Sequence, residues 1–308
     1  MTYDGEDVLY ISTDGGKTWG SQTVINAEDG VDYRDPGILY LGNNKFLLNY
    51  FTAHENAKGE RVTANSYVRQ GTLTGETIVW GDAVQVPLQS PHGPILLQNG
   101  DLFWVGDAMY DPNEGYDKDG NGSNDYSLGN EYAMKSTDGG LTWTWVAHMP
   151  DVVTNSNAGC EYNTVQAASG KLITTIRLLE NGILNTYVTT STDNGKTWTA
   201  PTLVTCGAPA EMLLHSSGVI VMTYGFRGDG EGDVAYGVRA RFSFDEGKSW
   251  SEEILLDGTA YNSDCGYPAS VELSDGSIYT VYYKTDKSGS VPGIWSINWT
   301  LPVQSPES

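Results

Sequence analysis

Basic residues are scarce in this sequence. Its 308 residues include 17 Lys plus Arg against 39 Asp plus Glu, which gives a formal net charge of −22. A protein that binds nucleic acid needs a basic surface for the phosphates, and anionic membrane surfaces also attract basic segments. The charge balance therefore argues against nucleic acid and against a membrane surface as partners.

Cysteines, long apolar runs and leader-like features are also few or missing. Cys160, Cys206 and Cys265 lie far apart without C-x-x-C spacing, which disfavours a zinc site or a disulfide framework. Three free thiols, or one disulfide and a spare thiol, remain open. No segment of about 18 apolar residues is present to span a membrane. The first residues lack the basic and apolar regions of a signal peptide, so either a cytoplasmic location or a removed leader is expected.

Aromatic residues, by contrast, are abundant. The chain contains 19 Tyr and 9 Trp, is 39% hydrophobic and is 18% charged. These fractions are typical of a globular protein rather than a disordered one. A high aromatic content suits β-strands, and it also suits stacking against sugars.

One eight-residue pattern, S-x-D-x-G-x-[ST]-W, occurs four times. The copies are Ser12–Trp19, Ser136–Trp143, Ser191–Trp198 and Ser243–Trp250. Their Asp residues are 124, 55 and 52 positions apart, so one unit in the long interval lacks the pattern. We expect its degenerate copy within Asn65–Asp82. Repeats at this period indicate an array of similar structural units.

Each copy is interpreted as a turn between two β-strands. Ser and Asp side chains accept backbone N–H bonds, Gly supplies a positive φ, and Trp anchors the returning strand. Short β-branched and aromatic strands surround each copy, four to a unit, which predicts an all-β propeller as one domain over residues 1–308. The N-terminal hairpin, Asp7–Ile11 with Ser21–Ile25, is expected to be a remnant first blade of a six-bladed propeller. The alternative is a closed five-bladed ring.

The repeated pattern resembles the Asp box, or BNR repeat, of the sialidase (neuraminidase) superfamily of six-bladed propellers. The resemblance covers essentially the whole chain and implies that the boxes themselves are structural. In that superfamily three arginines hold the carboxylate of an acidic sugar, a Tyr activated by a Glu is the nucleophile, and an Asp is the acid/base. A neutral Tyr avoids repulsion from an anionic substrate, but its phenol needs a nearby base.

The resemblance assigns roles to particular residues here. Cys265-Gly266-Tyr267 resembles the nucleophile segment, so it implies that Tyr267 attacks the substrate. Gly159-Cys160-Glu161 resembles the segment of the partner Glu, which implies that Glu161 is the base. Arg177 and Arg227 then correspond to two carboxylate-binding arginines, and His92 to the lining of the pocket. Arg239 and Arg241 alternate along a strand and are expected to form surface or interblade pairs instead.

The N-terminal part departs from the family pattern. Tyr33-Arg34-Asp35-Pro36-Gly37 is similar to the segment that carries the first arginine, which makes Arg34 a candidate substrate-binding residue. Its position after the first Asp box, however, predicts that it opens the second blade. On that interpretation the first arginine and the acid/base Asp are missing. If Arg34 does serve, the candidate proton donors on the following loop are His54, Glu55 and Glu60.

A further polar loop matches the D-x-[DN]-x-[DN]-G pattern of calcium-binding loops. Its candidate ligands are Asp117, Asp119, Asn121 and Asp125. Oxygen ligands around a Gly-permitted turn suit Ca²⁺, although position 12 is Leu128 and not the usual Glu. Glu131 or Glu114 would have to complete the shell. A structural Ca²⁺ is therefore one interpretation, and a plain polar insertion is the other. We expect no cofactor to be required.

Together these observations predict a glycoside hydrolase that removes a terminal acidic sugar, most simply α-linked sialic acid, from glycans. The resemblance implies an extracellular protein, and a monomer or weak homodimer is expected. Two alternatives remain open: a carbohydrate-binding propeller without catalysis, and a propeller hydrolase or lyase for another acidic sugar.

Overall fold

The computed structural model describes residues 5–55, 61–109, 131–150, 160–229 and 235–302, and these residues contain strands but no helix. They group into two compact units. Unit 1 comprises Met1–Thr164 with Asp193–Trp198, and unit 2 comprises Val165–Thr192 with Thr199–Ser308. The prediction of one domain over the whole chain stays a prediction.

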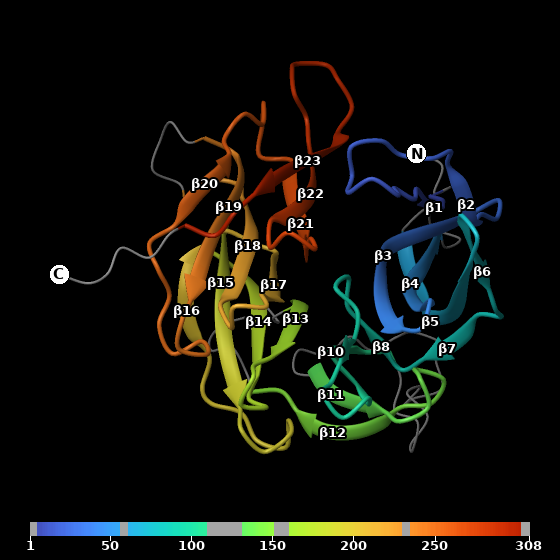
Figure 1. The fold of residues 1–308 in the computed structure, drawn as a ribbon, viewed down its shortest axis with the longest axis horizontal. Helices are drawn as coiled ribbons and strands as arrows, with labels where there is room; N and C mark the ends of the chain where they lie inside the picture. Colours follow the sequence, from blue (N-terminus) through green and yellow to red (C-terminus); the bar gives the residue numbers. More distant parts are fainter. Residues whose placement is uncertain (1–4, 56–60, 110–130, 151–159, 230–234, 303–308) are drawn as a thin grey trace. The chain divides into compact units, whose positions relative to one another are not determined.

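Unit 1 contains a two-stranded sheet and two larger sheets. The small sheet pairs β1 (Asp7–Leu9) with β2 (Thr23–Asn26). The next sheet has the order β3-β4-β5-β6 with β7 beside β5, and the third has the order β12-β11-β10-β8 with β9 beside β10. The bounds are β3 Val31–Gly42, β4 Lys45–Glu55, β5 Arg61–Thr74, β6 Thr77–Trp80, β7 Val84–Val86, β8 Leu88–Gln89, β9 Ile95–Leu96, β10 Leu102–Ala108, β11 Glu131–Ser136 and β12 Thr144–His148. In Figure 1, β3, β4 and β5 lie side by side in blue to cyan.

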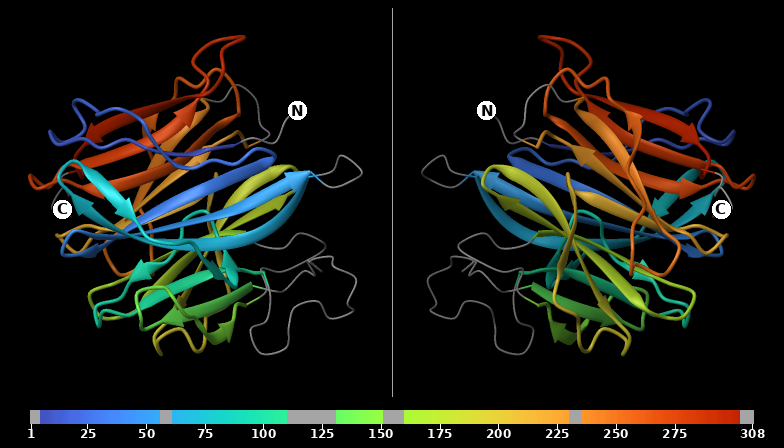
Figure 2. Two further views of the ribbon diagram at one scale, coloured as in Figure 1. Left: turned by 90° about the vertical axis from the view of Figure 1, so that its right-hand side faces the viewer. Right: turned by 90° about the vertical axis from the view of Figure 1, so that its left-hand side faces the viewer.

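Unit 2 contains three antiparallel sheets, with β13 carrying the chain into it from unit 1. The orders are β13-β14-β15-β16, β17-β18-β19-β20 and β21-β22-β23. The bounds are β13 Cys160–Gln166, β14 Leu172–Glu180, β15 Ile183–Ser191, β16 Thr202–Cys206, β17 Ala210–Leu214, β18 Ile220–Phe226, β19 Gly237–Ser243, β20 Ile254–Asp257, β21 Cys265–Glu272, β22 Ile278–Lys284 and β23 Gly293–Trp299. Figure 2 shows the twist of these sheets, which the chirality of L-residues imposes.

The Asp boxes are turns held by their own polar side chains, as predicted. In the second box, Ser136 Oγ donates to Asp138 Oδ1 (2.8 Å) and accepts from the N–H of Gly140 (2.9 Å). Asp138 also accepts from the N–H groups of Leu141 and Thr142 and from Thr142 Oγ1. The side chains therefore satisfy backbone donors that the turn leaves without strand partners.

The box tryptophans anchor their turns in three of the four copies. Trp143 is buried in the core of unit 1, Trp198 lies 6.2 Å from the ring of Phe103, and Trp250 packs against the core of unit 2. Trp19 differs, because 49% of its surface is exposed. Its hairpin is the separate two-stranded sheet β1-β2 and not part of a larger sheet.

The chain is a β-propeller of five blades, which confirms the predicted all-β fold and matches the five-bladed alternative. Each blade is one of the five larger sheets. The interval between the first two boxes contains the blade β3–β7, whose β5-β6 turn lacks the pattern. The N-terminal hairpin forms a separate two-stranded sheet, and among the described residues no third strand pairs with it.

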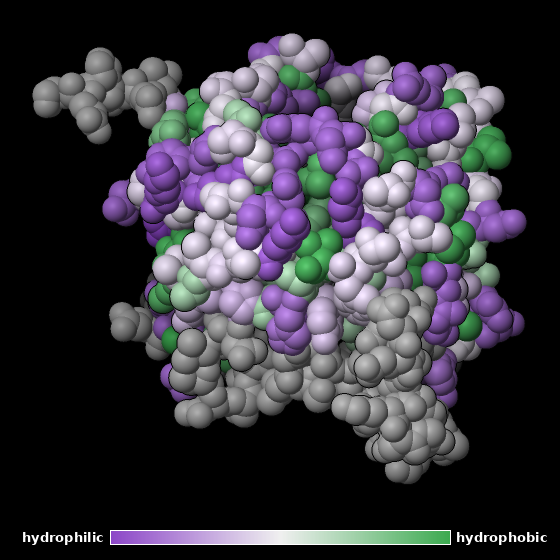
Figure 3. Space-filling view, turned by 90° about the horizontal axis from the view of Figure 1, so that it is seen from below, coloured by the Kyte–Doolittle hydropathy of each residue, from purple (hydrophilic) through white to green (hydrophobic). Residues whose placement is uncertain are grey.

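The surface of the described residues carries polar side chains over most of the face drawn in Figure 3, with small hydrophobic groups between them. Within those residues, no helix has the length and apolar composition that a membrane crossing requires.

We expect Asp138→Ala to lower the free energy of unfolding by about 1–3 kcal/mol, because four donors in the turn lose their acceptor. Chemical denaturation monitored by tryptophan fluorescence measures the change. Asp82→Ala, at an exposed loop position of the same unit, is the matched control. Equal losses for the two variants would show that the Asp box adds no stability.

Candidate functional site

Tyr267 occupies a strained position at the start of β21. Its φ is +48°, a value that a bulky L-residue rarely adopts. The pairing of β21 with β22 shifts between Gly266 and Ala269, so Tyr267 and Pro268 form a β-bulge. A bulge redirects a side chain out of the regular alternation, and strain of this kind concentrates at functional sites. The predicted nucleophile thus lies in a β-bulge with a strained backbone.

Two arginines from neighbouring blades approach Tyr267. The Nη1 group of Arg177, on β14, donates to Tyr267 Oη over 3.4 Å. Arg227 follows β18, and its Cζ lies 5.5 Å from the centroid of the Tyr267 ring. The structure therefore brings together three residues that the sequence proposed for one site. Two guanidinium groups beside one phenol form a positively charged group that suits an anionic ligand.

Tyr283 and Asp264 complete this cluster, although the sequence analysis assigned them no role. Arg227 donates from Nη2 to Tyr283 Oη, and Tyr283 Oη donates to Asp264 Oδ1, each over 2.8 Å. Arg227 Nε also donates to the carbonyl of Cys265 (2.8 Å). Burial raises the pKa of Tyr283, and Asp264 reinforces the rise against the opposing charge of Arg227. The phenol of Tyr283 therefore stays protonated at neutral pH.

Two glycines permit the close approach that this cluster requires. A Cβ on Gly225 would lie 2.9 Å from the Cα of Gly266, and a Cβ on Gly266 would lie 2.9 Å from the Cα of Gly225. Gly266 also has a φ of +116°, which favours glycine. Because β18 and β21 touch backbone to backbone here, Arg227 reaches the Cys265 carbonyl two residues before Tyr267.

A second group of ionisable residues lies in unit 1. Asp107 on β10 pairs in register with Glu131 on β11. Burial raises the pKa of Asp107 to about 8, and the charges of Glu131 and Glu161 add to the rise. Burial also lowers the pKa of His92 to about 4, although the charge of Glu161 opposes this. At neutral pH, Asp107 is therefore protonated and His92 is neutral.

Glu161, the predicted base, also has a left-handed backbone. Its φ is +52° at the second residue of β13. Glu161 belongs to the group in unit 1, together with His92 and Asp107. Its predicted role beside Tyr267 stays a prediction.

Arg34, the remaining predicted substrate-binding residue, lies on β3 and pairs with Asp32 (3.1 Å). The residue after it, Asp35, has a φ of +48°, and the strand pairing shifts between Arg34 and Gly37. Asp35-Pro36 thus repeats the bulge of Tyr267-Pro268. Sequence reasoning gave Asp35 no role, but the shared X-Pro step was a signal for it. The Arg34 segment lies on the first strand of the first of the five blades and not, as was predicted, of a second blade, because the N-terminal hairpin is a separate two-stranded sheet.

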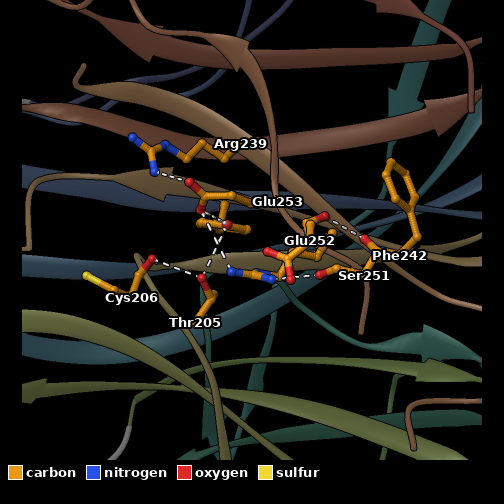
Figure 4. A network of polar contacts seen from close by, with 9 residues as sticks. Thr205, Cys206, Arg239, Phe242, Ser251, Glu252 and Glu253 are labelled. Atoms are coloured by element: carbon orange, nitrogen blue, oxygen red, sulfur yellow. Dashed lines mark hydrogen bonds and ion pairs between the residues drawn. The ribbon is translucent and has the colours of Figure 1, made fainter. Parts of the chain in front are cut away.

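Arg239 and Arg241 belong to a structural network, in which Figure 4 labels Arg239 and Glu253. Arg239 bonds to Glu253 Oε1, and Arg241 Nη2 lies 3.9 Å from Glu253 Oε2. Tyr224 Oη donates to the same carboxylate (2.9 Å) and accepts from Thr205 Oγ1 (3.2 Å). The arginines therefore pair with a partly exposed acid of their own blade, so of the two expected kinds, surface and interblade pairs, these are not interblade pairs.

The predicted calcium ligands Asp117, Asp119, Asn121 and Asp125 lie outside the described residues. Among the residues that are described, no group of three or more His, Cys, Asp or Glu side chains has the arrangement of a metal site.

Two of the residues that the sequence analysis missed, Asp107 and Tyr283, share a position with one that it found, Arg177. Asp107, Arg177 and Tyr283 are each the sixth residue of the second strand of their blade. In β18 the sixth residue is Gly225, and Arg227 follows two positions later. The Asp of the following box lies 31 residues after Asp107 but 16 after Arg177, and no box follows Tyr283, so the shared position becomes visible only from the strand bounds.

The comparisons with known proteins agree with this fold. Residues 4–280 match the model of the BNR repeat-like domain, and the chain therefore belongs to this family. No curated protein matches the chain.

Several solved structures share the propeller. A protein of unknown function from Dyadobacter fermentans is 22% identical, with a TM-score of 0.77 over 96% of this chain and 84% of the other. The NanB sialidase of Streptococcus pneumoniae (K499G mutant) is 13% identical, with a TM-score of 0.64 over 94% of this chain and 63% of NanB. The α-L-arabinanase of Penicillium chrysogenum is 15% identical, with a TM-score of 0.55 over 83% and 78%. At these identities the likeness establishes the fold alone.

The raised pKa of Asp107 predicts a pH-dependent stability. The unfolded chain releases this proton near pH 4 and the folded chain near pH 8, so stability falls as the pH rises between these values. The decline from this group is at most about 1.4 kcal/mol per pH unit. We expect Asp107→Asn to reduce this fall in the free energy of unfolding, as measured by urea denaturation at pH 5 and pH 8. Asp82→Asn is the control, and an unchanged slope in Asp107→Asn would contradict a protonated Asp107.

Proposed function

We propose that this protein is a glycoside hydrolase that removes a terminal acidic sugar, most simply α-linked sialic acid, from glycans. The observation that carries the proposal is the cluster in unit 2, in which Arg177 and Arg227 flank Tyr267. Guanidinium groups bind carboxylates through charge-assisted hydrogen bonds, and an anionic substrate favours a neutral nucleophile such as a phenol.

In the proposed reaction, Arg177 and Arg227 hold the carboxylate of the sugar so that its anomeric carbon faces Tyr267 Oη. The phenol attacks this carbon as its proton passes to a base, and the glycosidic oxygen leaves with a proton from an acid. Water then cleaves the tyrosyl–sugar bond and restores the phenol. We propose Glu161 as the base, from its sequence context and its strained backbone.

The neighbours in fold support a sugar ligand in general. One is a sialidase by its title and another is an α-L-arabinanase. This chain spans 63% of the NanB structure, so the activity of that whole protein comes here only as a proposal. An extracellular location and a structural Ca²⁺ at Asp117, Asp119, Asn121 and Asp125 are likewise proposals, made from the family resemblance and the loop sequence.

A second candidate function is carbohydrate binding without hydrolysis. The observation that favours it is the ion pair of Arg34 with Asp32, because this occupies the residue proposed as the third carboxylate-binding arginine. Formation of a hydrolysis product would distinguish an enzyme from a protein that only binds the glycan.

We expect wild-type protein to release the fluorophore from a fluorogenic α-sialoside and Tyr267→Phe to lower kcat by about 10³-fold or more, because the nucleophilic oxygen is removed. Tyr261→Phe, at a residue that is 56% exposed, is the matched control. Full activity of Tyr267→Phe would refute the proposed nucleophile.

The absence of turnover in the wild type would refute a sialidase. Binding of sialylated glycans on an array would then favour the second candidate function. Product analysis on uronic and other ulosonic glycosides would identify a hydrolase or lyase that acts on another acidic sugar.

A further inference from the structure

Arg227 is held by part of its hydrogen-bonding capacity and leaves the rest for a ligand. Its Nε group donates to the Cys265 carbonyl and its Nη2 group to Tyr283 Oη, both over 2.8 Å. A guanidinium has five N–H donors in a fixed plane. Both Nη1 donors and one Nη2 donor therefore lack an acceptor among the described residues. These adjacent donors match the two oxygens of a carboxylate.

The two bonds also fix the plane of the guanidinium. Cys265 supplies a buried backbone oxygen that cannot move with a side-chain rotamer. Tyr283 supplies the second point from β22, where it pairs in register with Gly266. One hydrogen bond would leave the group free to rotate about that contact, whereas two separate acceptors define its orientation.

Asp264 determines the direction of the bond at Tyr283. A phenol has one proton, so Tyr283 Oη donates to Asp264 and is left with lone pairs that accept from Arg227. The backbone of Asp264 is held by Asn262, whose Oδ1 accepts from the Asp264 N–H (3.0 Å). The hydrogen bonds therefore run in one direction, from the Arg227 guanidinium through the Tyr283 hydroxyl to Asp264 on the exposed loop.

We propose that Tyr283 is a positioning residue, oriented by Asp264, which holds Arg227 with its free donors arranged for a carboxylate. The identity of the ligand rests on the proposed function, but the hold on Arg227 does not. Tyr283 would touch neither the reacting carbon nor the leaving group. Its removal should weaken binding of the acidic sugar more than it slows the chemical step.

The first experiment measures Arg227 directly, without any ligand. We expect the ¹⁵N NMR signal of the Arg227 side chain, assigned with Arg227→Lys, to show slow guanidinium rotation in the wild type and fast rotation in Tyr283→Phe. Asp264→Asn keeps an oxygen acceptor for Tyr283 and should preserve slow rotation, whereas Asp264→Ala should not. Tyr279→Phe, on the same strand with its hydroxyl bonded to Ser296, is the control.

Slow rotation that persists in both Tyr283→Phe and Asp264→Ala would overturn the proposal. If Tyr283→Phe does not fold, as judged by thermal unfolding against Tyr279→Phe, the pair Asp264→Asn and Asp264→Ala answers the same question without any change in β22.

The second experiment measures binding of free N-acetylneuraminic acid by calorimetry. We expect Tyr283→Phe to bind it about tenfold more weakly than the wild type, as is typical for a lost hydrogen bond to a charged group. In the fluorogenic assay the change should fall mainly on KM. Equal affinity in Tyr283→Phe, or a loss confined to kcat, would overturn the positioning role. A wild type that shows slow Arg227 rotation but binds no sialic acid would refute the proposed ligand while supporting the hold on Arg227.

Discussion

The contact between Gly225 and Gly266 is the constraint on which the candidate site in unit 2 depends. A Cβ on either residue would lie 2.9 Å from the other's Cα. The missing side chains let β18 and β21 meet directly, and this brings Arg227 within hydrogen-bonding distance of the Cys265 carbonyl. The same segment then turns through the bulge at Tyr267. The separation of Arg227 from Tyr267 is thus set by backbone atoms, which move less than side chains do.

Neighbouring side chains stabilise the position of β18 at the contact between Gly225 and Gly266. Tyr224, which precedes Gly225, is fully buried, and its hydroxyl bonds to Glu253 and Thr205. Arg239 (Figure 4) and Arg241 reach the same carboxylate. The buried hydroxyl of Tyr224 thus has two hydrogen-bond partners, which favours one arrangement of its strand. The network lies outside the cluster around Tyr267, but it fixes the strand end from which Arg227 extends.

The sequence predicted the parts of the fold that repeat and missed those that depend on single contacts. Four Asp boxes predicted the turns, because Ser, Asp, Gly and Trp act within eight consecutive residues. Tyr267, Arg177 and Arg227 were also found, since each lies in a recognisable segment. Tyr283 and Asp264 were not, because a Tyr on a strand looks like a core residue until the register places it opposite Gly266. Asp107 was missed for a similar reason, because its raised pKa follows from burial that no local pattern encodes.

The sixth position of the second strand explains how one blade design yields different chemistry in the two units. This position holds Asp107 in unit 1, and Arg177 and Tyr283 in unit 2. The strand geometry is the same, so the residue type and its neighbours decide the outcome. Asp107, beside two other carboxyl groups, keeps its proton at neutral pH. Arg177 and Tyr283 converge instead on Tyr267 and Arg227. The protein has a net charge of −22, so it repels an anionic ligand at long range unless positive charge is concentrated near the binding site. Arg177, at this one strand position, supplies part of that positive charge without any change in the fold.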